Sequence, residues 1–125
     1  MELNIKTIDG KREIKLKSSA YFAIRYKAEF HKDALKDIFE MLVAVEECKD
    51  ENGKIVFLNS ELFETLMNLT WVLAKNANEN IEPPQAFFDN NEIPLLDEVD
   101  NIVDMIMMSL GTTIDSKKNM NQAAM

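Results

Sequence analysis

The chain has 125 residues, of which 46% are hydrophobic, and its formal net charge is -8. That length suits one domain with one hydrophobic core. The acidic balance disfavours nucleic acid and anionic membranes as partners, because both repel negative charge. The single Cys48 excludes an internal disulfide, the apolar runs are far shorter than the roughly 20 residues that span a bilayer, and the N-terminus lacks a signal-peptide pattern. We therefore expect a cytosolic protein.

Residues 3–17 predict a β-hairpin. Asp9-Gly10 is a dipeptide that tolerates the positive φ angles of a type I′ turn, and apolar residues alternate on both sides of it. With these two residues as the loop, the strand partners are Leu3 with Leu16, Ile5 with Ile14, and Lys6 with Glu13. Apolar side chains then share one face, and opposite charges pair on the other. Because an isolated hairpin is marginal in water, we expect the apolar face to lie on helices.

Two helices are expected after the hairpin. Ser18 or Ser19 can cap the first, which ends near His31. Its large side chains are Tyr21, Phe22, Ile24, Tyr26 and Phe30. Asp33 can cap the second, which covers residues 34–48. The stripe that we expect to face the core on this second helix consists of Leu35, Ile38, Phe39, Leu42 and Val45.

The chain then bends at Gly53 and enters the apolar run Ile55–Leu58. That run can add a third strand to the hairpin or lead into the next helix as extended chain, and its length leaves both possibilities open. The helix Ser60–Ala77 is apolar over about half its circumference, more than the roughly 100° that a helix on one surface needs. We therefore place it at the centre of the fold, with Asn59 or Ser60 as its cap.

Pro84 is expected to open a short helix that sends Phe87 and Phe88 into the core, and Pro94 a last helix that ends at Gly111. The apolar arc of the last helix is Leu95, Leu96, Val99, Ile102, Val103, Ile106 and Leu110. The sequence thus predicts an α+β fold, mostly α-helical, with an N-terminal β-hairpin packed on a small bundle of about four to five helices. Residues 1–111 form a single domain, and residues 112–125 a flexible polar tail.

Side chains that could support catalysis are few. His31 and Cys48 each occur once, and the three glycines stand too far apart for a phosphate-binding loop. One His and one Cys cannot complete a zinc site, and the loop around Gly53 lacks the carboxylates of a calcium loop. We therefore expect a protein that is not an enzyme and has no cofactor and no metal.

Trp71, Met105 and Met108 are the candidate partner-binding residues. Trp71 lies at the edge of the central stripe, where it is either a partly buried core residue or part of an interface. Met105 and Met108 fall outside the apolar arc of the last helix, among polar residues. Flexible thioethers on a polar face suit adaptable binding, although single exposed apolar residues are also normal.

Three segments, taken in order, cover nearly the whole chain. The first is the hairpin running into A-Y-F-A-I-R-Y-K-A-E-F-H-K-D-A-L, where the matching positions are Phe22, Arg25, Tyr26, Phe30, Asp33 and Leu35. The second is W-V-L-A-K-N-A-N-E-N-I, and the third is E-I-P-L-L-D-E-V, continuing through the last helix to S-L-G-T-T. Together they resemble the tail assembly chaperones of long-tailed bacteriophages and prophages. Members often have Gly where this chain has His31, and Trp where it has Phe87.

The resemblance implies a non-enzymatic chaperone that binds the tape measure protein, keeps it soluble and helps recruit tail tube protein. It implies a place in the host bacterial cytoplasm and absence from the mature virion, and we expect a homo-oligomer. The family commonly makes a longer form by a -1 ribosomal frameshift, and this form recruits the tail tube protein. Lys117-Lys118-Asn119 is compatible with the slippery heptamer A-AAA-AAC.

The charge also permits an acidic protein that mimics DNA and blocks a DNA-binding partner. Such a mimic needs carboxylates spaced like phosphates along an exposed face, and Asp97, Asp100 and Asp104 form only a short row. A small enzyme would need convergent polar groups in a pocket, and the sequence offers no such set. The chaperone is therefore the preferred hypothesis.

Overall fold

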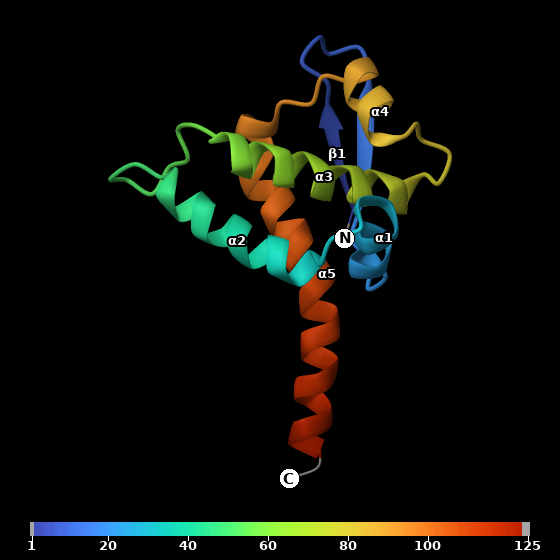
Figure 1. The fold of residues 1–125 in the computed structure, drawn as a ribbon, viewed down its shortest axis with the longest axis vertical. Coiled ribbons are helices and arrows are strands. Elements are labelled where there is room, and N and C mark those ends of the chain that lie inside the picture. Colours follow the sequence, from blue (N-terminus) through green and yellow to red (C-terminus); the bar gives the residue numbers. More distant parts are fainter. Residues whose placement is uncertain (1, 124–125) are drawn as a thin grey trace.

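The computed structural model describes the backbone of residues 2–123 and the side chains of residues 2–111. Within these residues the chain forms one antiparallel hairpin followed by five helices (Figure 1). The elements are β1 (Glu2–Lys6), β2 (Glu13–Lys17), α1 (Phe22–Phe30), α2 (Ala34–Glu47), α3 (Ser60–Ala77), α4 (Pro84–Asn90) and α5 (Leu95–Ala123). The predicted α+β, mostly helical fold is confirmed.

The hairpin has the predicted register but a different loop. The strand partners are Leu3 with Leu16, Ile5 with Ile14, and Lys6 with Glu13, as expected. The loop has four residues, 8–11, because the N–H of Thr7 donates to the carbonyl of Arg12 (3.0 Å). Of Asp9 and Gly10 only the glycine has a positive φ, 72°, so the predicted type I′ turn is wrong. The Asp9 carboxylate closes the loop by accepting from the Thr7 hydroxyl (2.6 Å), and this bond lowers the pKa of Asp9.

The apolar face of the hairpin packs on α3. Ile5 and Leu16 are fully buried, and Leu3 and Ile14 are partly buried against the same core. At the end of β2, the carbonyl of Lys17 accepts a hydrogen bond from the Asn76 side chain near the end of α3 (3.1 Å). Two strands alone would leave this face in water, so α3 supplies the surface that makes the hairpin stable.

Helix α3 lies at the centre of the fold, as the breadth of its stripe predicted. It contacts β2, α1, α2, α4 and α5, and Figure 1 shows it crossing between the hairpin and the lower helices. Its buried residues are Leu62, Leu66, Leu69, Thr70, Trp71, Val72, Leu73 and Ala74. The Asn59 side chain caps its first turn by accepting from the N–H of Leu62 (2.8 Å).

The first two helices are joined by a tight left-handed corner. The prediction that Ser18 or Ser19 caps α1 is wrong, because the N-cap is Tyr21 and it makes no side-chain capping bond. The Ser19 hydroxyl accepts from the N–H of Tyr21, one residue before the helix begins. The helix ends at His31, whose φ of 57° turns the chain. Asp33 then caps α2 as predicted, accepting from the N–H groups of Leu35 (2.9 Å) and Lys36.

The core face of α2 differs from the prediction. Ile38 and Val45 are buried and Leu42 is partly buried, but Leu35 and Phe39 are exposed. The structure instead turns inward the smaller or more flexible side chains Ala34, Met41 and Ala44. Apolar residues surround most of this helix, so more than one side of it could pack on α3. The side that does so is not the one with the bulkiest residues.

The run Ile55–Leu58 leads into α3 as extended chain. Ile55 is buried and forms an isolated antiparallel bridge with Lys49, and the N–H of Val56 donates to the carbonyl of Cys48 (3.2 Å). Within the part of the chain that the structure describes, this run does not join the hairpin. The strand alternative is therefore wrong.

Pro84 is the first residue of α4, and Phe87 is buried as predicted, with Phe88 partly buried beside it. Helix α5 begins directly after Pro94 but continues past Gly111, where the sequence predicted its end. Gly111 lacks the left-handed backbone that a terminating glycine adopts. The expected flexible tail, residues 112–125, lies outside the residues whose side chains are described.

Candidate functional site

Trp71 is part of the hydrophobic core. Its side chain is only 4% exposed, its indole N–H donates to the carbonyl of Glu82 (2.9 Å), and its ring meets Phe30 edge-on at a centroid distance of 5.8 Å. The Lys75 ammonium lies 5.8 Å from the ring centroid. Of the two alternatives for Trp71, the structure therefore shows the core residue.

Met105 is fully buried and Met108 is 49% exposed. The core-facing side of α5 is wider than the predicted arc and includes Met105 and Ser109. The backbone carbonyl of Met105 accepts from the hydroxyls of Ser18 (3.1 Å) and Ser109 (3.2 Å), so this stretch of α5 is fixed against the chain that precedes α1. Of the three candidates, Met108 alone is at the surface.

A different group of apolar residues, some exposed and some partly buried, lines a groove. It consists of three shallow hollows across α3, the segment before it, α4 and the start of α5. The apolar side chains that line it include Ile8, Val56, Leu58, Phe63, Met67, Phe88 and Leu96. We call this surface the acid-rimmed groove.

The three hollows of the groove are neighbours because they share lining residues. The first, of about 350 Å³, lies between Val56 and Leu96. The second, of about 510 Å³, shares Leu96 with the first and extends to Ile8 and Phe63. The third, of about 360 Å³, shares Phe63 with the second and continues to Phe88. An extended or helical segment of a partner can therefore place successive apolar side chains in consecutive hollows.

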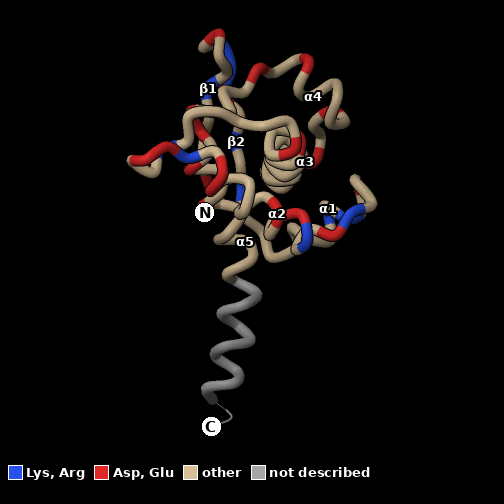
Figure 2. Tube along the Cα trace, turned by 60° about the vertical axis from the view of Figure 1, so that its left-hand side comes forward, with Lys and Arg blue, Asp and Glu red and all other residues tan. Residues whose placement is uncertain are grey.

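The rim of the groove is negative. Asp97 and Asp100 border the first hollow, and Glu64 and Asp89 border the third. All four carboxylates are exposed, and the one ammonium among the lining residues of these hollows is that of Lys54. Figure 2 shows Asp and Glu distributed around α3 and α4. This rim attracts a partner whose apolar side chains are flanked by Lys or Arg.

The wall of the groove is held by contacts between the hairpin loop and the α4–α5 linker. The N–H of Ile8 donates to the carbonyl of Glu92 (2.8 Å). The Arg12 guanidinium donates to the side-chain oxygen of Asn91 (3.3 Å), and buried Asn91 in turn donates to the carbonyl of Phe87 (2.9 Å). Ile8 is thereby presented at a fixed position although it is exposed.

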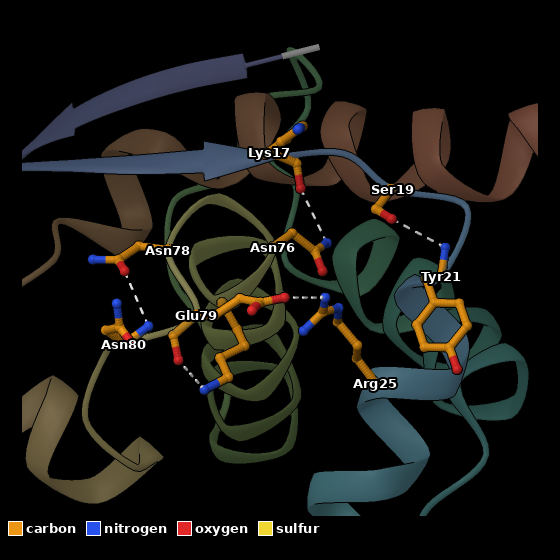
Figure 3. A network of polar contacts seen from close by, with 9 residues as sticks. Lys17, Ser19, Tyr21, Arg25, Asn76, Asn78, Glu79 and Asn80 are labelled. Carbon is orange, nitrogen blue, oxygen red and sulfur yellow. Dashed lines mark hydrogen bonds and ion pairs between the residues drawn. The ribbon is translucent and has the colours of Figure 1, made fainter.

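A polar network occupies the opposite end of α3 (Figure 3). Arg25 of α1 forms an ion pair with Glu79 (3.1 Å), and the Asn76 amide donates to the carbonyl of Lys17. Among the described side chains, the Arg25 Nε and the Asn76 Oδ1 are buried without a hydrogen-bond partner. These contacts join α1, β2 and α3 and contain no acid and base arranged for proton transfer.

His31 and Cys48 are held apart by the whole of α2. His31 precedes this helix and Cys48 follows it, and 14 residues of helix span about 21 Å. Cys48 is fully buried, with the Asn59 amide 3.7 Å from its sulfur. This separation excludes a catalytic pair of the two. The described residues contain no group of three or more His, Cys, Asp or Glu side chains that could hold a metal ion.

No protein family, curated protein or solved structure matches the chain. Among the residues described, no helix combines the length and the apolarity needed to cross a membrane.

Proposed function

We propose that this chain is a non-enzymatic tail assembly chaperone of a long-tailed phage or prophage. The tape measure protein is its client and binds in the acid-rimmed groove. The observation that supports this proposal best is the groove itself, three adjoining hollows with Phe63 and Leu96 at their junctions and four exposed carboxylates around them. The identity of the client comes from the resemblance of the three sequence segments to that family.

The groove defines the chemistry of the client segment. The spaces around Phe63 and Leu96 take apolar side chains, while Glu64, Asp97 and Asp100 favour Lys or Arg beside them. A long helical client exposes such apolar stripes before assembly and aggregates through them. Covering the stripes with a protein of net charge -8 keeps the complex dispersed.

The proposal includes the family's further properties. The protein acts in the host bacterial cytoplasm, a longer frameshifted form recruits tail tube protein, and neither form remains in the mature virion. The test is co-expression of this chain with the tape measure protein of the same genome, followed by size-exclusion chromatography of the soluble fraction. A client that is soluble and co-elutes only when this chain is present supports the proposal.

Two variants locate the client. Phe63→Ser combined with Leu96→Ser removes the apolar side chains that join the hollows, and both are already partly in water, at 44% and 43% exposure. Loss of co-elution is expected with this double variant. Tyr21→Ser is the control, since Tyr21 is 55% exposed and does not line the groove. Equal behaviour of the two variants would refute the groove as the client site.

A client that stays insoluble with both the short and the frameshifted form would refute the chaperone proposal as a whole. The DNA-mimic alternative is then the one to test, because Asp97, Asp100 and Asp104 are all exposed along α5. Its own readout is competition of this chain with labelled DNA for a DNA-binding protein of the host.

A further inference from the structure

Helix α2 has an apolar line on its outer side. Leu35, Phe39 and Val43 are 47%, 66% and 62% exposed. Four residues separate each from the next, so at about 100° per residue they lie within roughly 40° of one direction. The core residue Met41 lies on the opposite side of the helix, about 200° around from Phe39. We call Leu35, Phe39 and Val43 the outer line of α2.

The two ends of the outer line carry opposite charges. At the Leu35 end, a hollow of about 560 Å³ is lined by Lys27, His31 and Lys32, with Asp33 as its one carboxylate. Its apolar floor includes Ile24 and Ala28 of α1. At the Val43 end, a hollow of about 450 Å³ is lined by three glutamates, Glu40, Glu47 and Glu61. One helix face therefore joins a basic hollow to an acidic one.

We propose that a second copy of this chain covers this face, with the two α2 helices antiparallel and the two-fold axis at Phe39. Such a two-fold interface uses the same patch on both copies. Phe39 then meets Phe39 of the second copy, and Leu35 meets Val43. Lys32 lies two residues before α2 begins, and the antiparallel arrangement brings it near the C-terminal end of α2 in the second copy, where Glu46 lies. Each basic hollow faces the acidic hollow of the other copy.

The charge pattern favours a second copy over another client. A client of the acid-rimmed groove is apolar and basic, and Lys27, Lys32 and Lys36 would repel it at one end of the outer line. A uniformly acidic partner would be repelled by the three glutamates at the other end. Only a partner with the reversed pattern satisfies both ends, and the two-fold rotation of this chain supplies it.

The expected dimer is weak. A stable protein–protein interface buries about 800 Å² on each partner, and one helix face with two adjacent hollows is at the small end of that range. Glu46 already forms an ion pair with Lys49 of its own chain (2.7 Å), although its side chain is 71% exposed. In the dimer its carboxylate is therefore shared between Lys49 and Lys32 of the second copy. Dimerisation should therefore depend on concentration and weaken with added salt.

Sedimentation equilibrium over a wide range of protein concentration tests the dimer. Phe39→Glu places two carboxylates at the two-fold axis and is expected to weaken association at least tenfold. Phe57→Glu is the matched control, because Phe57 is 52% exposed and does not line either hollow of α2. Circular dichroism checks that both variants fold. A parent protein that stays monomeric at all concentrations overturns the proposal.

A charge swap tests the antiparallel geometry. The pair of Lys32 with Glu46 of the other copy occurs twice in the dimer. Lys32→Glu alone turns both pairs into two glutamates, and Glu46→Lys alone turns both into two lysines. Each variant should be more monomeric than the parent, whereas an equimolar mixture should form a heterodimer in which both pairs are attractive. Native mass spectrometry distinguishes the heterodimer by mass. A mixture no more associated than its components overturns the arrangement.

The proposal is independent of the client site. Phe63→Ser with Leu96→Ser should leave the dimer intact. Phe39→Glu should leave co-elution with the tape measure protein intact. If Phe39→Glu abolishes client binding while the parent is monomeric, the outer line of α2 is a client surface and the dimer is refuted.

Discussion

The indole N–H of Trp71 donates to the backbone carbonyl of Glu82, 2.9 Å away, and this bond fastens α3 to the segment that precedes α4. The ring is buried against Phe30 of α1. Trp71 therefore joins three parts of the chain. As the single tryptophan, it also reports on all three through its fluorescence.

Trp71→Phe should lower the free energy of unfolding by about 1–3 kcal/mol, because the Glu82 carbonyl loses its donor while most of the ring volume is kept. Urea unfolding followed by circular dichroism measures the loss. Client binding per folded molecule should not change. A fall in client binding at full folding would restore Trp71 as a contact residue.

His31→Gly should raise the free energy of unfolding by up to about 1 kcal/mol, because His31 has a φ of 57°, a conformation that costs an L side chain roughly 1–2 kcal/mol and glycine little. Part of the gain is offset by the greater freedom of glycine in the unfolded chain. His31→Ala keeps the strain and is the control. A gain with alanine equal to that with glycine would show that the imidazole, not the backbone, is the cause.

The pH dependence of stability should reveal Tyr26. Burial, and then the Asp37 carboxylate that accepts from its hydroxyl at 2.5 Å, raises the pKa of Tyr26 well above its usual range. Above about pH 10 the unfolded tyrosine releases its proton while the folded one keeps it, so stability falls by up to about 1.4 kcal/mol per pH unit.

Tyr26→Phe removes this slope. The variant should be the less stable protein at neutral pH, since Asp37 loses its donor. Its deficit should shrink as the pH rises above about 10. Urea unfolding at stepwise pH values measures both effects, and parallel curves for parent and variant would contradict the assignment.

The rim of the groove should control the salt dependence of client binding. Asp97→Asn with Asp100→Asn removes two carboxylates beside Leu96 and should weaken binding several-fold, with a smaller loss on adding salt. Lys54→Met removes the one cation of the rim and should strengthen binding. Isothermal titration calorimetry with a basic amphipathic segment of the client gives the dissociation constants of the parent and of both variants. Tighter binding by the Asp→Asn double variant and weaker binding by Lys54→Met would exclude an electrostatic role for the rim.

The elements of this fold could be predicted because local chemistry marks their ends. Asn59 and Asp33 cap helices that begin directly after them, and Pro84 and Pro94 mark the starts of α4 and α5. The strand register followed from alternation alone. These signals act within a few residues, so a single sequence contains them.

The direction in which helices face could not be predicted equally well. Nine apolar residues surround α2, namely Ala34, Leu35, Ile38, Phe39, Met41, Leu42, Val43, Ala44 and Val45. More than one face of such a helix can be buried, and the fit to α3 decided in favour of Ala44 and Met41 over Phe39. Met105 was misplaced for the same reason, since α5 packs over a broader arc than its bulkiest residues define. The groove combines residues from the hairpin loop, the segment before α3, α3, α4 and the start of α5, and no local pattern links these five stretches.

The dependence of the hairpin on α3 has a consequence for synthesis on the ribosome. The strands are made first, but the helix that covers Ile5 and Leu16 is complete only at Ala77, roughly 60 residues after the end of β2. At a translation rate of about 5–20 residues per second, this apolar face stays exposed for roughly 3–12 s before α3 is complete. A chain proposed to protect another protein from aggregation thus exposes an aggregation-prone apolar face of its own during synthesis. Slow codons between Lys17 and Ala77 would lengthen that exposure.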